Sequence, residues 1–62
     1  MTPAQLYTTA LARAAEAKRE WEERHRAYGP DSPYTRRAMT DYGIAVFAAR
    51  RAWDAFKLEN PL

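Results

Sequence analysis

Apolar residues recur at helical spacing along two long stretches of the chain, and a short stretch containing Gly and Pro separates them. The first stretch carries a seven-residue repeat on one helix face, formed by Tyr7, Ala14, Trp21 and Tyr28. The second stretch carries a comparable stripe, formed by Ala38, Tyr42, Ala45, Ala49, Ala52 and Phe56. Because no segment alternates apolar and polar residues as a half-buried strand does, the pattern predicts two amphipathic helices.

Capping signals mark the ends of the first predicted helix. Thr2 can cap it, Pro3 suits its first position, and Gln5 can complete a capping box. Gly29 and Pro30 then stop the helix, because Gly tolerates the backbone conformation that follows a helix end and Pro cannot continue the helix.

The second helix restarts directly after this stop. Asp31 or Ser32 can cap it, Pro33 fits its first turn, and the helix should end before Pro61. We therefore expect one domain over 1–62, with a helix over about 3–28, a hinge over 29–32 and a helix over about 33–59.

A hinge this short makes the two helices antiparallel neighbours. A hairpin that folds near residue 31 brings together positions whose numbers sum to about 63, so that Trp21 meets Tyr42 and Tyr7 meets Phe56. The expected fold is all-α, a two-helix antiparallel hairpin that assembles into a four-helix or larger bundle by self-association.

The expectation of self-association comes from surplus apolar surface on the second helix. At about 100° per residue, Ile44, Phe47 and Leu58 fall on the side away from the stripe, together with Arg51. A contiguous apolar strip at helical spacing usually marks an interface. We therefore predict that these four residues contact a second copy, with a dimer as the first expectation. Two alternatives remain, a solvated strip and a surface for a different protein.

Charged residues indicate a solvated surface more than a nucleic-acid groove. Ten basic and eight acidic residues give a net charge of only +2. Most of them have an opposite charge four positions away in the same helix; the expected pairs are Lys18–Glu22, Arg19–Glu23, Glu20–Arg24, Glu22–Arg26, Arg37–Asp41 and Arg50–Asp54. Arg13, Arg50 and Arg51 come near one another in the hairpin register and form a candidate anion-binding cluster, for a phosphate or an acidic partner.

The residue groups that catalysis and metal binding usually need are missing. Cys is absent, and the only His, His25, lies at the edge of the buried stripe with no Ser or Asp placed to orient it. We therefore expect a half-buried packing role for His25, no cofactor, no metal and no enzymatic activity. No apolar run approaches the roughly 18 residues of a membrane span, which makes the cytoplasm the default location. Frequent Ala and Arg favour a GC-rich source, such as an actinobacterium or one of its phages.

The hinge carries one local resemblance. From Gly29 to Thr35 it reads Gly-Pro-Asp-Ser-Pro-Tyr-Thr, which resembles the loop Gly-Pro-Asp-His-Pro-x-Thr of kinesin-light-chain-type tetratricopeptide repeats. The match covers seven residues of 62, with Ser32 in place of His. It implies a helix–loop–helix hinge and a protein-binding role at most, because one helix pair cannot form a stacked array.

A hairpin of this kind is expected to act by binding. The first hypothesis is a small, phage-encoded interaction or regulatory protein that self-associates and binds a protein partner. The architecture is also similar to that of the plasmid regulator Rop, a hairpin that dimerises and binds paired RNA loops, although the sequences are not alike. The alternatives are therefore a nucleic-acid-binding regulator and a protein that sequesters small anionic nucleotides.

Overall fold

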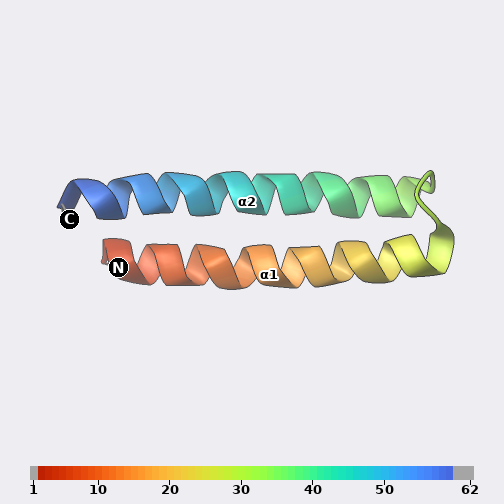
Figure 1. Ribbon diagram of the computed structural model, residues 1–62, viewed down its shortest axis with the longest axis horizontal. Helices are drawn as coiled ribbons and strands as arrows, with labels where there is room; N and C mark the ends of the chain where they lie inside the picture. Colours follow the sequence, from red (N-terminus) through yellow and green to blue (C-terminus); the bar gives the residue numbers. More distant parts are fainter. Residues whose placement is uncertain (1, 60–62) are drawn as a thin grey trace.

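The computed structural model describes residues 2–59, which form two long helices joined by a tight turn. Helix α1 spans Pro3–Tyr28 and helix α2 spans Pro33–Glu59, so the expected stop at Pro61 lies outside the described residues. The helices run antiparallel, and their free ends lie together, opposite the turn (Figure 1). The chain is an all-α hairpin with extents of 43 × 18 × 13 Å, and no strand occurs between residues 2 and 59.

The start of α1 is fixed by a complete capping box. The Thr2 hydroxyl accepts a hydrogen bond from the Gln5 backbone N–H at 3.2 Å, and the Gln5 side chain accepts one from the Thr2 N–H at 2.9 Å. Pro3 occupies the first helical position, where its missing N–H costs nothing. Two backbone donors that a helix start would leave unpaired are therefore satisfied by local side chains.

The turn combines a backbone adjustment at Gly29 with a side-chain bridge from Thr35. Gly29 has φ 87° and ψ 171°, a conformation that L residues rarely adopt, and its N–H donates to His25 O at 2.9 Å. Ser32 caps α2 by accepting from the Tyr34 N–H at 3.2 Å. The Thr35 hydroxyl donates to Gly29 O at 2.7 Å and lies 3.1 Å from Arg24 O, so α2 is tied to the end of α1. Thr35 is only 2% exposed.

Aromatic side chains close the seam between the helices at two levels. Trp21 stacks on Tyr42 with ring centroids 6.4 Å apart, and Tyr7 stacks on Phe56 at 6.3 Å, which confirms both predicted pairs. Between them lies Ala49, which is buried. Small residues in the middle let the helix axes approach, while the rings fill the seam toward its ends.

This seam encloses very little. Within residues 2–59, no large side chain is fully buried, and only Thr35, Ala38 and Ala49 are buried at all. Trp21 and Trp53 lie in the seam but are only half-buried. The hairpin exposes 5107 Å², whereas a monomeric globular protein of 7.2 kDa exposes about 4,100 Å². Its radius of gyration, 14.0 Å, likewise exceeds the value of about 11 Å for a compact chain of this length.

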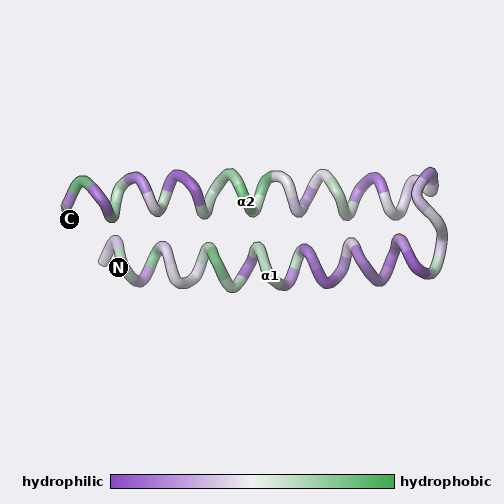
Figure 2. Tube along the Cα trace, viewed as in Figure 1, coloured by the Kyte–Doolittle hydropathy of each residue, from purple (hydrophilic) through white to green (hydrophobic). Residues whose placement is uncertain are grey.

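Apolar residues are unevenly distributed along the hairpin. The half of α1 next to the turn is the most hydrophilic part of the chain, while the other half of α1 and the middle of α2 are more apolar (Figure 2). The apolar surface left open by the seam therefore lies mainly away from the turn.

Two sequence expectations about the surface are wrong. None of the six intrahelical ion pairs expected from four-residue spacings forms within 4.0 Å; across residues 2–59, the one salt bridge joins Lys57 and Asp54 at 3.5 Å. His25 is exposed, although its ring centroid lies 5.6 Å from that of Trp21. The expected ion pairs are absent because long exposed side chains lose rotamer entropy when they pair, and this cost offsets most of the Coulomb gain in water.

Candidate interaction surfaces

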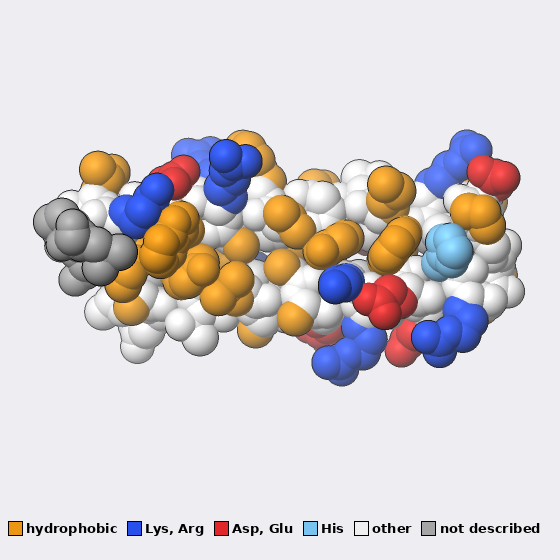
Figure 3. All heavy atoms as spheres, viewed as in Figure 1, with side chains coloured by type: hydrophobic (Ala, Val, Ile, Leu, Met, Phe, Trp, Pro, Cys, Tyr) orange, Lys and Arg blue, Asp and Glu red, His pale blue; other side chains and the backbone are white. Residues whose placement is uncertain are grey.

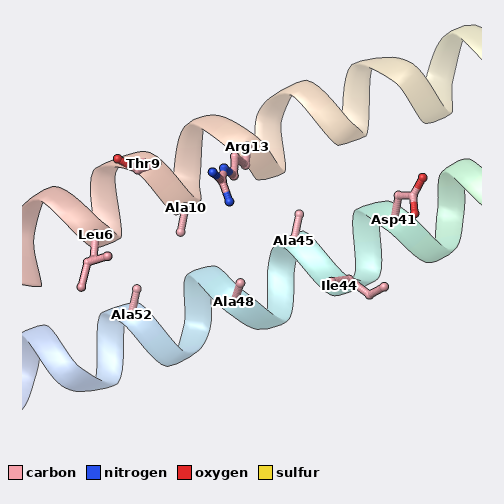
Figure 4. Close-up of a pocket in the computed structure, with 9 residues that line it drawn as sticks. All are labelled: Leu6, Thr9, Ala10, Arg13, Asp41, Ile44, Ala45, Ala48 and Ala52. Carbon is pink, nitrogen blue, oxygen red and sulfur yellow. The ribbon is translucent and has the colours of Figure 1, made fainter. Parts of the chain in front are cut away.

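A groove runs along one side of the seam, between the first half of α1 and the middle and end of α2. Its volume is about 450 Å³, and its lining residues are Leu6, Thr9, Ala10, Arg13, Asp41, Ile44, Ala45, Ala48 and Ala52 (Figure 4). Most of the lining is apolar, and four of its nine residues are alanines. Short side chains on both walls leave room for the side chains of another helix.

The larger apolar side chains of the groove lie in water. Leu6 on α1 is 47% exposed, and Ile44 on α2 is 64% exposed. Ala10 points toward α2, and Ala45, Ala48 and Ala52 point toward α1 (Figure 4). These residues come from both helices and together form one apolar surface. A helical-wheel projection of either helix alone does not reveal it.

One positively charged side chain lies inside this apolar groove. The Arg13 side chain projects from α1 into the space between the helices (Figure 4). Asp41 also lines the groove, but no carboxylate of the described residues lies within 4.0 Å of the Arg13 guanidinium. Arg13 therefore has no ion-pair partner among residues 2–59.

Toward the turn, a second hollow adjoins the groove and is mostly charged. It is lined by Glu20 and Arg24 from α1 and by Tyr34, Arg37, Ala38 and Asp41 from α2. Asp41 lines both hollows, so the two lie next to each other. We call Glu20, Arg24, Arg37 and Asp41 the charged quartet. It contains two acids and two bases, and within the part of the chain that the structure describes none of them forms an ion pair.

The strip predicted from the sequence is exposed but falls into two parts. Ile44 lines the groove, whereas Phe47, Arg51 and Leu58 lie outside it. Phe47 is 62% exposed and Leu58 is 86% exposed. We call Phe47 and Leu58 the outer strip, because they lie on the side of α2 that faces away from α1.

The three arginines of the candidate anion cluster do not share a hollow. Arg13 lines the groove, but neither Arg50 nor Arg51 does. All three are exposed. Because successive helical residues point about 100° apart, Arg50 and Arg51 are directed to different sides of α2.

The other side of the seam is apolar as well, but it carries long cationic side chains. Figure 3 shows a face on which hydrophobic side chains follow the seam beside the single His, with Lys and Arg side chains among them. Helical geometry places Leu11 and Val46 on the side opposite the groove. There the Lys57 ammonium lies 5.9 Å from the centre of the Trp53 ring and covers part of it.

Comparisons with known proteins add no relative. The chain matches no family model, and no curated protein or solved structure shows significant similarity to it. Residues 2–59 hold no group of three or more potential metal ligands. Over the same residues, neither helix combines the length and apolar character that crossing a membrane requires.

Proposed function

We propose that this chain is a small, non-enzymatic interaction protein, which self-associates and binds a protein partner through the apolar surface that its seam leaves open. The observation that supports self-association most directly is the missing interior. Of residues 2–59, only two alanines and one threonine are buried, so the hairpin has little hydrophobic free energy to offset the entropy of folding.

Two separate apolar surfaces support two binding events. The groove is built by both helices and suits a partner that also presents two helices, whereas the outer strip of Phe47 and Leu58 belongs to α2 alone. A four-helix bundle formed by two hairpins would leave one of these surfaces uncovered for a different protein.

Sedimentation equilibrium tests the self-association. We expect a mass above that of the 7.2 kDa monomer at micromolar concentrations, falling toward it on dilution. Folding and association are linked, so the melting temperature should rise with protein concentration. A folded monomer whose mass and melting temperature do not change over a hundredfold range of concentration would refute the proposed function.

A further inference from the structure

We propose that a second copy of the chain covers the groove side of the hairpin, related to the first by a twofold axis parallel to the helices. The two turns then lie at the same end of a four-helix bundle. This arrangement rests on the proposed self-association and adds to it the face, the orientation and the level at which the copies meet.

The exposed area indicates a partner of this size. The hairpin exposes about 1,000 Å² more than a globular monomer of its mass. An interface of standard size covers about 800 Å² on each partner. A second hairpin on one side of the seam therefore removes about as much surface as the isolated chain has in excess.

The distribution of side chains along the groove side fixes the orientation. Apart from Arg13, this side is apolar at the free-end half, with Leu6 and the alanines, and it is charged at the turn half, with the quartet. A twofold axis parallel to the helices packs the apolar half of one copy on the apolar half of the other, and the quartet of one copy on the quartet of the other. An axis perpendicular to them would press the charged half of each copy against the apolar half of the other, at a high desolvation cost.

The quartet holds two acids and two bases, so two quartets that meet in this orientation bring no net charge to the interface. Positions that sum to about 63 lie at one level of the hairpin, as the Trp21–Tyr42 contact shows, so Asp41 is level with residue 22. The parallel twofold axis places α1 of one copy on α2 of the other. Arg24 then comes within about 3 Å, measured along the axis, of both Asp41 and Arg37 of the second copy, because two residues of helix rise by that amount.

The opposite side of the seam is less suited to a second copy. Lys57 already covers part of Trp53 there. Two copies meeting on that side would each have to bury or displace this lysine. The groove side instead offers equal numbers of acids and bases in its quartet.

Matched substitutions to glutamate test the face. Ala48 lines the groove and is exposed, so Ala48→Glu should leave the hairpin fold intact but bury a carboxylate at the interface. We expect it to raise the dimer dissociation constant about a hundredfold. Ala12→Glu, at an exposed alanine of α1 outside the groove, should change it less than about threefold. Helical circular dichroism at equal monomer concentration checks that both variants still fold.

The outcomes of this test are distinct. A monomeric parent protein refutes both the proposed function and this arrangement. If the parent protein is a dimer and Ala48→Glu leaves it dimeric, the groove is not the interface. The same holds if Val46→Glu dissociates the dimer instead. Either result refutes only the groove and leaves the self-association standing.

A spin label at the turn tests the orientation. Because the chain has no cysteine, Asp31→Cys provides a single labelling site. The parallel twofold axis predicts an interspin distance on the order of 20 Å in the dimer, since packed helices lie about 10 Å apart and the labels add their own length. The perpendicular axis separates the two turns by nearly the length of the hairpin, which is 43 Å. A single long distance would therefore overturn the proposed orientation.

Discussion

Trp21 of α1 stacks on Tyr42 of α2 with their ring planes 24° apart, and this contact sets the level at which the two helices meet. The indole N–H of Trp21 is buried without a hydrogen-bond partner. Apolar contact and ring stacking therefore hold this residue in place, with no polar anchor.

Trp21→Ala should remove much of the stability of the protein. Large-to-small substitutions of enclosed aromatic residues cost about 3–5 kcal/mol, and a half-buried ring should cost about 3 kcal/mol. A domain of this size has only a few kcal/mol in total. Thermal unfolding followed by circular dichroism should therefore lose its cooperative transition. Met39→Ala, at an exposed apolar residue of α2, should melt close to the parent; if Trp21→Ala does so too, the seam is not the stabilising contact.

Thr35→Val should weaken the turn without changing the shape of the side chain. The substitution removes the hydroxyl that donates to Gly29 O and leaves a partly buried carbonyl without this donor. We expect a loss of about 1–3 kcal/mol in the free energy of unfolding, measured by urea denaturation. Thr40→Val is the matched control, because the Thr40 hydroxyl is exposed and bonds only Arg36 O of its own helix. Equal losses in the two variants would show that the bridge across the turn contributes nothing.

Local patterns explain why the hairpin could be predicted from the sequence. The capping residues Thr2 and Gln5, the positive φ of Gly29 and the seven-residue repeat all act over a few residues, so their consequences follow from short-range geometry. The aromatic pairs then follow from the hinge position alone, because an antiparallel hairpin with a short turn has little freedom in register.

The groove and the turn bridge could not be predicted in the same way. The groove needs residues of both helices, such as Ala10 of α1 and Ala52 of α2, at matching levels and rotations. A helical wheel drawn for α2 alone instead places Ile44 in a strip with Phe47. The role of Thr35 depends on carbonyl groups 6 and 11 residues earlier in the chain. The sequence pattern quoted for the hinge includes this threonine, but it does not indicate what its hydroxyl bonds.

The two glycines should respond in opposite directions to alanine. A Cβ at Gly43 would meet nothing within 4 Å, and Gly in a helix interior costs about 1 kcal/mol relative to Ala. Gly43→Ala should therefore raise the free energy of unfolding by about that amount. Gly29→Ala should lower it by about 1 kcal/mol, because φ of 87° strains an L residue even though space is free. A destabilising Gly43→Ala would indicate that another chain approaches this position closely.

Phe47→Asp separates the outer strip from the groove. Phe47 lies outside the groove, so the substitution should leave the dimer mass unchanged and alter the melting temperature by less than about 3 °C. Sedimentation equilibrium and thermal melting at one concentration measure both effects. Dissociation of the dimer by this change would instead place the second copy on the strip of Ile44, Phe47 and Leu58.

Replacing Arg13, Arg50 and Arg51 by Gln tests nucleic-acid binding. Since these arginines do not share a hollow, we expect the parent to bind RNA or DNA only weakly, with affinity that falls steeply as salt rises. The triple variant should bind about as weakly. Fluorescence anisotropy with a labelled RNA hairpin at low and physiological salt measures this. Sub-micromolar binding at physiological salt that the triple variant loses would favour a nucleic-acid-binding regulator.

The hydrogen bonds of the Thr35 hydroxyl also influence whether the two packed helices come from the same chain or from two different chains. Every contact that α2 makes with α1 would be equally available to α2 of a neighbouring molecule if the turn opened, so two chains could exchange helices at little energetic cost. The backbone conformation of Gly29 and the hydrogen bond from Thr35 to Gly29 O stabilise the closed turn, and they therefore favour packing of α2 on α1 of the same chain. One buried hydroxyl thus biases the molecule toward separate, self-contained hairpins and against a domain-swapped pair.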